Sequence, residues 1–545
     1  MKTINVPVLV IGAGPIGLAM GLDLGWRNIG CLILDREAEP DAAINAHPRA
    51  AAVTPRTMEF CRRWGVSQDV HNSGFPFDFT PNIVYCLDMQ GPTVTVQEFD
   101  PIATRQLTPF SPELRHRCPQ MWFDPILERG LAKYPSVSLR RPWVMDDFED
   151  RGEAGLVAQV TDLTNGEKIE VHCQYMIGAD GGNSGVRERL GIRTEGDGLL
   201  SYSINAILNI PNFLSTHNKG AAERYMFLDH RGVWSELTVI DGRDRWRLGY
   251  AGSPSESDRA SVDMSAMIRR VLGPDVPYEI VALTPWKRRE QMAAQFRKGR
   301  VFLAGDAAHA IPPNLGMGMN TGLGDVMGLG WKLEAVLNGW AGPGLLDTYE
   351  TERKPVAVHN GATSTRTYRR WMTAIPDYSD IGAPDEKGEQ ARARAAAHIN
   401  ATLSDGWDTL GFQIGYRYDD SPICIDDGSP VPPVNTSARL RPFTPTARPG
   451  ATAPHAWLKD GRSILDLFGR GFVLLNFGGE GDVSAFSAAA HQRGVPFSVV
   501  DIDQPEIAAL YENRYVLVRP DNHVAWRSDT LPQDALAVID RVRGA

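Results

Sequence analysis

A chain of 545 residues, 43% hydrophobic and 22% charged, is long enough for two to four globular domains of about 150 residues each. Its formal net charge of -10 gives no reason to expect a nucleic acid or an anionic membrane as partner. The six cysteines form no C-x-x-C pair and no zinc-ligand spacing, so we expect a cytoplasmic protein without a metal site. No run of about 18 apolar residues predicts a membrane span, and three glycines interrupt the signal-like start of the chain.

The chain begins with a pattern that predicts one β-α-β unit. A β-branched run, Val8 to Ile11, is followed by a helical pattern in which Leu18 and Leu22 lie four residues apart. A second strand-like run, residues 31–34, ends at Asp35. A β-α-β unit of this kind can bind a dinucleotide at its first turn.

An amphipathic helix is predicted next, and Gly65 ends it. Its core-facing residues follow the spacing i, i+3, i+4, i+7 and are Thr57, Phe60, Cys61 and Trp64. The residues on its other side are Arg56, Glu59, Arg62 and Arg63. Cys31 and Cys61 lie within apolar patterns, so we expect both to be core thiols.

Two further sheets are predicted in the middle and at the end of the chain. Residues 201–250 alternate apolar and polar side chains, which predicts antiparallel sheet. Residues 301–304 predict a buried strand that leads through a glycine-rich loop into a helix ending near Leu337. Residues 375–405 are helical in pattern, and residues 430–454 form a proline-rich linker. The strands of a separate small α/β domain are expected at 472–477, 497–500 and 515–518.

The first motif that indicates a chemical function is Gly12-x-Gly14-x-x-Gly17, between the first strand and the first helix. Gly12 makes the tight turn, Gly14 lets the backbone approach a pyrophosphate, and Gly17 lets the helix pack on the strand. The helix N-terminus then faces the phosphates. Asp35, about 20 residues further on, can accept hydrogen bonds from a ribose diol.

This fingerprint does not separate FAD from NAD, and two later motifs decide between them. The second motif, residues 177–187, contains Asp180-Gly181, and the third, residues 299–320, contains Gly305-Asp306. In the third motif an aspartate able to hold a polyol chain follows a buried strand, and two prolines stiffen the loop after it. Glycines then expose several N–H groups just before a helix, where they can stabilise negative charge on a ring.

Together these motifs resemble the single-component (group A) flavoprotein aromatic hydroxylases, the class that contains p-hydroxybenzoate hydroxylase and phenol hydroxylase. The resemblance includes Arg49 in His47-Pro48-Arg49-Ala50, Gln120 in Gln120-x-x-x-Asp124, and the stretch from Leu346 to Arg353. It therefore spans most of residues 5 to 360.

The resemblance implies that the chain binds FAD. The turn of Gly12, Gly14, Pro15, Ile16 and Gly17 would hold the pyrophosphate. Asp35 would hold the adenosine ribose, with Arg36 beside it.

The other cofactor contacts implied by the resemblance come from four segments. Arg49 and Gln120 would contact the ribityl-pyrophosphate part, and Asp180 and Gly181 would serve FAD and nicotinamide binding. Asp306, which follows Gly305, would bind the ribityl chain. The floor beside the isoalloxazine would be formed by Pro313, Gly316, Gly318, Met319 and Asn320. Leu315 departs from the glycine that many relatives have, which leaves the path of the loop beside the ring open.

The end of the chain resembles the C-terminal thioredoxin-like domain of the phenol and chlorophenol hydroxylase branch. The matching stretches are 449–458, 461–469 and 518–527. Because no C-x-x-C is present, we expect no redox role for this domain. His455 and His523 are expected to be structural.

The expected fold is therefore α/β, with a Rossmann-like FAD-binding domain like that of p-hydroxybenzoate hydroxylase. It would carry an inserted antiparallel-sheet substrate domain and a C-terminal thioredoxin-like domain. The expected boundaries are 1–195 and 291–435 for the FAD-binding domain, 196–290 for the substrate domain with pieces at about 75–115, and 436–545 for the C-terminal domain.

The activity implied by the resemblance is hydroxylation of a small, phenol-like substrate with NADPH or NADH and O2, through a flavin C4a-hydroperoxide. A dry pocket would suppress loss of H2O2. The aromatic side chains that either line this pocket or form the core of the sheet are Tyr225, Phe227, Trp234 and Trp246. A homodimer is compatible with the sequence.

Other functions remain open at this point. The same fold could act on a polycyclic or antibiotic substrate, and a flavin-bearing interaction module is an alternative from a different class. The W-x-W-x-I-P motif of flavin halogenases is absent from the sequence. NAD(P)H consumption stimulated by a phenol would separate an enzyme from a module.

The catalytic residues expected are Pro313, beside the ring, and His47, as the base that deprotonates the phenol. A histidine with an ordinary pKa of about 6.5 can accept a proton near neutral pH. His47 lies two residues before Arg49. It either faces the substrate, or packs on FAD and bonds to backbone. His309 is the competing candidate, although its place after Asp306 favours a role in ordering that loop.

Overall fold

The computed structural model describes residues 2–39, 50–250, 252, 255, 261–372, 378–403, 406–407, 409–432 and 443–545. His47 and Arg49 lie outside the described residues. Among the helices of the described part, none combines the length and apolar character needed to cross a membrane.

The first sheet is mostly parallel and holds the N-terminal β-α-β unit. Its strands run in the order β16 (Arg297–Lys298), β17 (Val301–Leu303), β10 (Glu167–Gly178), β1 (Lys2–Ile11), β2 (Cys31–Leu34) and β7 (Val137–Arg140), and β8 (Trp143–Asp150) and β9 (Leu156–Asp162) extend it beside β10. Strand β1 pairs in parallel with both β10 and β2, and β17 pairs in parallel with β10. The predicted strands at 8–11, 31–34 and 301–304 are confirmed.

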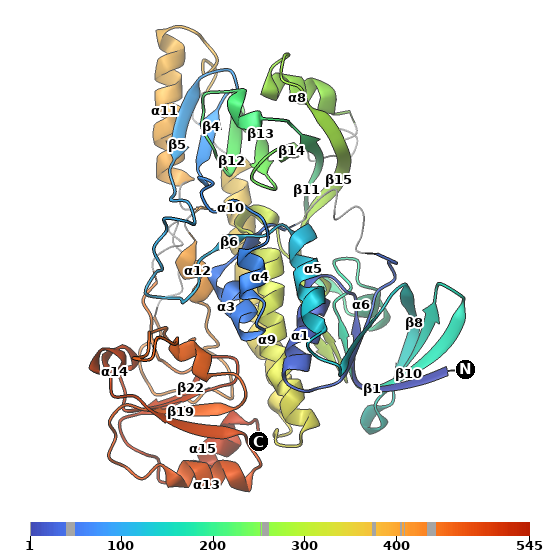
Figure 1. Ribbon diagram of the computed structural model, residues 1–545, viewed down its shortest axis with the longest axis vertical. Helices are drawn as coiled ribbons and strands as arrows, with labels where there is room; N and C mark the ends of the chain where they lie inside the picture. Colours follow the sequence, from blue (N-terminus) through green and yellow to red (C-terminus); the bar gives the residue numbers. More distant parts are fainter. Residues whose placement is uncertain are drawn as a thin grey trace.

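Helix α9 (Met317–Leu337) lies at the centre of the molecule, between the first sheet and the C-terminal domain (Figure 1). Helices α1 (Pro15–Trp26) and α10 (Thr348–Met372) pack against it, and α5 (Gln120–Leu131) packs against α1. The approach of α1 to α9 is close, because a Cβ on Gly330 would stand 1.9 Å from Asp23 Oδ2. The short helix α6 (Gly185–Arg189) follows β10.

The second sheet lies above the first in Figure 1. Its order is β18 (His309–Ala310), β15 (Glu279–Ala293), β11 (Thr194–Asn209), β14 (Arg245–Tyr250), β13 (Gly232–Val239), β12 (Arg224–Asp229), β4 (Ile83–Cys86) and β5 (Thr93–Gln97). The predicted antiparallel pairing is confirmed for the neighbouring strands β11, β14, β13 and β12. Strand β4, in contrast, pairs with β12 in parallel. The domain boundaries themselves stay predictions.

The four aromatic residues that could have lined a pocket form the core of this sheet instead. Tyr225, Phe227, Trp234 and Trp246 are buried in one apolar cluster with Met267 and Ile268 of helix α8 (Met264–Leu272). The opposite face packs on Trp371 of α10 and on helix α11 (Glu386–Thr402).

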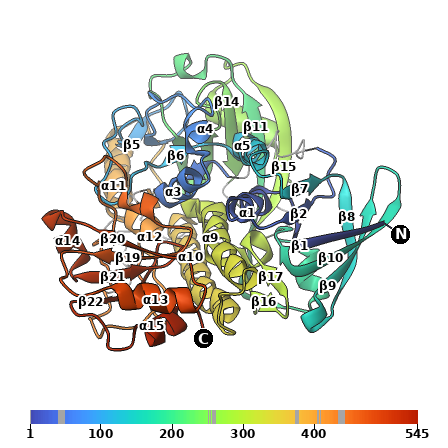
Figure 2. The ribbon, with the colours of Figure 1, turned by 60° about the horizontal axis from the view of Figure 1, so that its bottom comes forward.

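The C-terminal domain contains the three predicted strands and a fourth. Its sheet has the order β20 (Phe497–Asp501), β19 (Phe472–Asn476), β21 (Tyr515–Val518) and β22 (Val524–Ser528). Its helices are α13 (Ser484–Gln492), α14 (Pro505–Tyr511) and α15 (Ala535–Val542). Figure 2 shows this sheet beside α9 and α10, on the side away from β1. A mixed sheet flanked by helices agrees with the thioredoxin-like expectation.

The predicted amphipathic helix is α3 (Pro55–Arg63), but its polar side does not face solvent. Arg56 and Glu59 form a buried ion pair at 2.6 Å. Arg62 bonds to Asp466 at 2.7 Å, and Arg63 bonds to the carbonyl of Pro520 at 2.8 Å. Arg62 and Arg63 therefore form part of the contact with the C-terminal domain. The remaining short elements nearby are α4 (Ser67–His71), α12 (Leu410–Ile414), β3 (Ala52–Val53) and β6 (His116–Arg117).

The proline-rich segment does not behave as a free linker where it is described. Residues 433–442 lie outside the described part. Beyond them, Ala447, Arg448 and Ala451 are buried, and Gly450 O accepts a hydrogen bond from the backbone N–H of Tyr418 at 2.9 Å.

A buried ionic cluster joins the C-terminal domain to α9 and α10. Glu352 accepts hydrogen bonds from Arg519 at 2.6 and 2.9 Å and from Lys332 at 2.6 Å. Arg519 also bonds to Asp521 at 2.6 Å. All four side chains are 0–1% exposed, so each charge depends on the others for its stabilisation.

Replacing Arg519 by methionine should destabilise the fold by about 3–5 kcal/mol, because buried Glu352 would then keep only Lys332, and buried Asp521 only His523, as a basic partner. Denaturant unfolding at neutral pH measures the loss. The control Arg462→Met removes an exposed arginine of the same domain and should change the free energy of unfolding little. Equal losses in the two variants would contradict this assignment.

The loss should also depend on pH. Burial raises the pKa of Glu352, but the charges of Arg519 and Lys332 outweigh burial and lower it from 4.5 to about 2. A carboxylate with a lowered pKa in the folded state stabilises the fold above pH 4.5, and this contribution disappears as the pH falls toward 2. The difference between wild type and Arg519→Met should therefore shrink over that range.

Candidate active site

Four loops that follow neighbouring parallel strands meet at one edge of the first sheet. Gly12 follows β1, Asp35 follows β2, Asp180 follows β10 and Gly305 follows β17. Parallel strands place their carboxyl ends at the same edge, and ligands of open α/β sheets bind outside that edge. The structure therefore brings together the three motifs that the sequence analysis singled out.

The first turn has the geometry that a pyrophosphate site requires. Gly12 has φ of +102°, and a Cβ there would stand 2.5 Å from Ala179 O. A Cβ on Gly17 would stand 1.9 Å from Gly12 O, so only glycine permits this approach of helix to strand. A Cβ on Gly14, in contrast, would meet nothing within 4 Å. Helix α1 begins at Pro15, and its first N–H groups face this open space.

Asp35 and Arg36 occupy different environments after β2. Asp35 accepts hydrogen bonds from the backbone N–H of Ala13 at 2.6 Å and of Glu37 at 3.0 Å. The Asp35 side chain thus also fixes the glycine turn. The Arg36 side chain is 77% exposed and pairs with Glu37. Their predicted contacts with the adenosine ribose stay predictions.

The second motif is tied to the third by one arginine. Asp180 accepts hydrogen bonds from Ser184 Oγ at 2.5 Å and from Val186 N at 3.0 Å, which orders the loop before α6. Arg187 donates to Gly182 O at 3.1 Å and to Ala307 O at 3.0 Å. Gly181 has φ of +83°, and a Cβ there would meet nothing within 4 Å.

The third motif exposes one acid among buried neighbours. Asp306 is exposed, whereas Gly305, Ala307 and Ala308 are buried. Ile16 of α1 packs against Gly305, where a Cβ would stand 2.7 Å from Ile16 Cγ1. The Ile16 side chain therefore packs inside the protein, and only its backbone can serve a cofactor.

A buried carboxylate that the sequence analysis missed holds this loop in place. Asp325 of α9 is 0% exposed and accepts hydrogen bonds from Gly305 N at 3.0 Å, His309 Nε2 at 2.7 Å and Arg353 Nε at 2.9 Å. Burial raises the pKa of Asp325, but the charges of His309 and Arg353 outweigh burial and hold the pKa below its usual value. His309 is itself 0% exposed, which supports the loop-ordering role and leaves it unable to reach a substrate.

The loop before α9 presents backbone to the site and turns its side chains inward. Asn320 accepts hydrogen bonds from Thr54 N and Thr57 Oγ1, and donates to the carbonyls of Ala52 and Gly316. Gly316 has φ of +68° and begins α9. Leu315 of this loop and Met319 of the first turn of α9 are buried. Gly318, in the same turn, is open, since a Cβ there would meet only Ile311 O at 3.8 Å. Pro313 is exposed.

Gln120 lies at the first turn of α5 and contacts Ala50, the first described residue after position 39. Its backbone N–H donates to Ala50 O at 2.8 Å, and its side chain donates to Asp124 Oδ2 at 2.9 Å. Gln120 is 5% exposed.

These residues fit an FAD molecule. The open space at Gly14 lies at a helix N-terminus, the exposed Asp306 follows β17, and the part-exposed Gly316 and Gly318 lie at the start of α9. The cofactor roles of the individual residues stay predictions.

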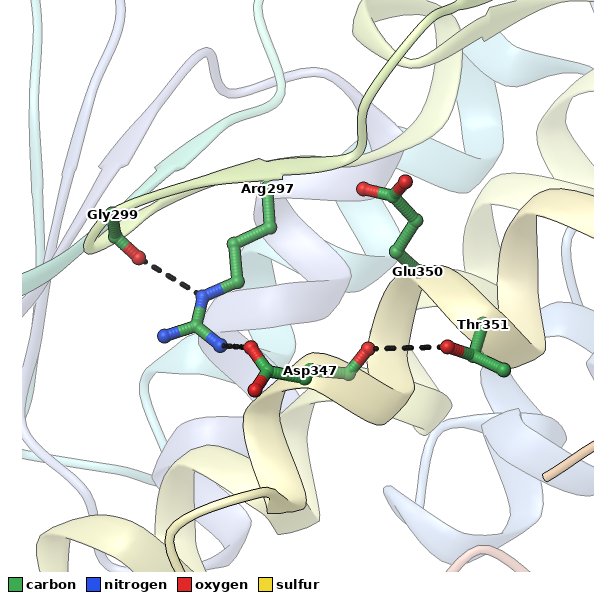
Figure 3. A pocket seen from close by; sticks show the side chains of 5 residues that line it. All are labelled: Arg297, Gly299, Asp347, Glu350 and Thr351. Atoms are coloured by element: carbon green, nitrogen blue, oxygen red, sulfur yellow. Dashed lines mark hydrogen bonds and ion pairs between the residues drawn. The ribbon is translucent and has the colours of Figure 1, made fainter. Parts of the chain in front are cut away.

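A cavity of about 410 Å³ lies elsewhere and does not belong to this site (Figure 3). It is lined by Arg297, Gly299, Asp347, Glu350 and Thr351. Arg297 forms an ion pair with Asp347 across it. Gly299 precedes β17, so the cavity lies at the amino end of that strand, opposite the edge where the loops meet.

Two family models match the chain. One, described as FAD binding domain, covers residues 5–363, and the other, described as aromatic-ring hydroxylase, C-terminal, covers residues 446–545.

Relatives of known activity match over nearly the whole chain. The tetracenomycin A2 monooxygenase-dioxygenase of Streptomyces glaucescens is 32% identical, and the match covers 98% of this chain and 95% of that protein. The 4-methyl-5-nitrocatechol 5-monooxygenase of a Burkholderia species is 30% identical, over 98% of this chain and 96% of that protein. A solved structure of RebC, soaked with chromopyrrolic acid and holding 7-carboxy-K252c, is 36% identical with a TM-score of 0.91, and the match covers 100% of both chains.

Asp306→Ala should weaken FAD binding by about tenfold or more, because it removes a charged acceptor for the ribityl chain. Titration of the apoprotein with FAD, followed by flavin fluorescence, measures the change. Asp347→Ala, which removes an exposed aspartate outside the site, is the control and should bind FAD as the wild type does. The assignment of Asp306 is wrong if its variant also retains wild-type affinity.

Proposed function

The chain belongs to the FAD-dependent aromatic hydroxylases, and from this premise we propose that it hydroxylates an electron-rich, phenol-type ring with NAD(P)H and O2. The observation that carries the proposal is the meeting of four strand-end loops and the start of α9 at one edge, directly beside the second sheet. Strand β18 pairs with β15 of that sheet and leads within two residues to Pro312 and Pro313. A ring bound over this loop would therefore lie under the second sheet.

Bound FAD supplies the electron transfer from NAD(P)H and the activation of O2 in this family. The chain supplies position and environment. Asp306 and the N–H groups at the start of α1 would bind the cofactor chain, and the backbone before α9 would lie against the ring, where a helix N-terminus favours negative charge. Pro313 would pack beside the ring. The second sheet would exclude water from the substrate.

A fused, polycyclic substrate is the second candidate. It is favoured by the tetracenomycin relative and by RebC, whereas the nitrocatechol relative favours a single ring. NADPH and NADH oxidation by the FAD-loaded enzyme should be stimulated by one of two sets, simple phenols or hydroxylated fused-ring compounds, with a product heavier by one oxygen atom. If no member of either set raises oxidation above the FAD-loaded blank, the proposed function is wrong.

We propose His47 as the base that deprotonates the phenol. The burial of His309 and its bond to Asp325 support this choice, since they leave the competing histidine away from any substrate. His47 itself lies outside the described residues, and its neighbour Ala50 bonds to the first turn of α5.

His47→Ala should keep FAD binding and flavin reduction but form less product per NADPH, with more H2O2. The deficit should shrink as the pH rises toward the pKa of the phenol, about 10, where the substrate ionises unaided. Product, NADPH and H2O2 are measured together across this range. His359→Ala, a half-buried histidine on α10, is the control. Unchanged coupling in His47→Ala at neutral pH would show that another group is the base.

A further inference from the structure

The stretch from Leu346 to Arg353, which carries part of the family resemblance, makes contacts with two parts of the molecule. Its earlier residues are fixed to the first sheet. Tyr349 Oη donates to Leu303 O at 2.8 Å, and Glu350 accepts a hydrogen bond from Phe296 N at 2.8 Å. Its last residue, Arg353, bonds instead to α9, the helix that begins beside the FAD-binding loops.

The side chain of Arg353 lies in a groove on the surface of α9. Two glycines of that helix, Gly324 and Gly328, stand about one turn apart and form the groove. A Cβ on Gly324 would stand 2.6 Å from Arg353 Nη2, and a Cβ on Gly328 would stand 3.1 Å from Arg353 Cδ. The Arg353 side chain is 1% exposed. The sequence of α9 therefore leaves room for one buried guanidinium at this place.

The guanidinium of Arg353 holds the first turns of α9 at two points. Its Nε donates to Asp325 Oδ1 at 2.9 Å, and its Nη2 donates to Thr321 O at 2.9 Å. Asp325 in turn accepts hydrogen bonds from Gly305 N and His309 Nε2, on either side of the loop aspartate. Arg353 is therefore connected to the loop of the third motif through a single side chain.

The remaining donor of Arg353 bonds to a tyrosine that the C-terminal domain covers. Arg353 Nη1 donates to Tyr418 Oη at 3.3 Å, and Tyr418 is 3% exposed. The ring of Tyr418 stacks on His523, with the ring centres 4.1 Å apart. His523 lies between β21 and β22 of the C-terminal domain. The contact of that domain with Tyr418 therefore ends on the same guanidinium that fixes the loop.

His523 contributes a packed ring to this contact. Its Nδ1 lies 3.2 Å from Asp521 O, and its Nε2 lies 3.5 Å from Thr452 Oγ1, so the ring is held within its own domain. Burial lowers the pKa of His523 against the opposing charge of Asp521, so the ring is neutral near pH 7. The position of Tyr418 thus depends on the docked domain and not on an ion pair with it.

We propose that Arg353 and Tyr418 are positioning residues for the flavin, through which the docked C-terminal domain holds the loop of residues 305–309 in its FAD-binding geometry. Both act through Asp325, and neither needs to touch the cofactor. The proposal rests on FAD binding and not on the proposed hydroxylation. It gives the C-terminal domain, which has no C-x-x-C pair, a part in binding the cofactor.

The variant Tyr418→Phe tests the proposal, because it removes the hydroxyl that Arg353 binds and keeps the ring that stacks on His523. Hydrogen–deuterium exchange of the full-length, FAD-loaded enzyme is followed by mass spectrometry on peptides that contain residues 304–309. These amides should exchange at least about fivefold faster than in wild type, and FAD should bind at least about fivefold more weakly, the lower end of ordinary coupling between sites. The visible circular dichroism of the bound flavin should change as well.

Tyr511→Phe is the matched control. Tyr511 is a buried tyrosine of the C-terminal domain, and its hydroxyl donates to Pro454 O at 2.7 Å. This variant should have a lower melting temperature, with exchange at residues 304–309, FAD affinity and flavin circular dichroism as in wild type. His523→Ala, which removes the ring that stacks on Tyr418, should in contrast speed exchange at residues 304–309.

Three results would overturn the proposal. The first is wild-type exchange at residues 304–309, or wild-type FAD affinity, in Tyr418→Phe. The second is an equal change in Tyr511→Phe, because the loop would then respond to any loss of stability. The third is wild-type exchange of the loop in His523→Ala. Exchange is measured without substrate or NADPH, so if the loop responds as expected but no aromatic compound stimulates NADPH oxidation, the proposed function fails and the positioning role stands.

Discussion

The burial of α9 is the constraint on which the rest of the structure depends. A charged side chain on a buried helix is tolerated only with a partner inside the protein. Asp325 pairs with His309 and Arg353, Lys332 with Glu352, and Glu334 with Arg27. These partners come from the third motif, from α10 and from α1. One helix therefore fixes the distances between the loop of Asp306, the first turn and the C-terminal domain.

The first sheet and the second sheet therefore have different parts in the proposed site. The carboxyl edge of the first sheet provides the loops that fit FAD, and β18, which pairs with β15, joins the third motif to the second sheet. The C-terminal domain contributes no cysteine to this arrangement. Its Asp466 contacts α3, and its Arg519 contacts α9 and α10. The domain therefore supports the helices that position the site.

Much of the fold could be predicted because its signals are local. Apolar runs bounded by glycines predict β1, β2 and β17, and the Gly12 turn and Asp306 follow them directly in the sequence. The pairing of Asp325 could not be predicted, since its partners lie 16 and 28 residues away and no periodicity joins them. The contacts of Arg62 and Arg63 of α3 with the C-terminal domain could not be predicted, because periodicity does not reveal that another domain covers the polar side of a helix. The part-buried contact of Arg224 with Glu236 was missed for a similar reason, since the two residues come from separate strands.

FAD is expected to bind across the four loop ends, with its ring beneath the second sheet. A crystal structure of the FAD-loaded enzyme tests it most directly. We expect density for the pyrophosphate at Gly14 and the start of α1, for the ribityl chain at Asp306, and for the ring between Pro313 and the side of the sheet that carries Arg247. Density for the ring on the α8 side of that sheet, or for the dinucleotide at the cavity lined by Arg297 and Asp347, would contradict it.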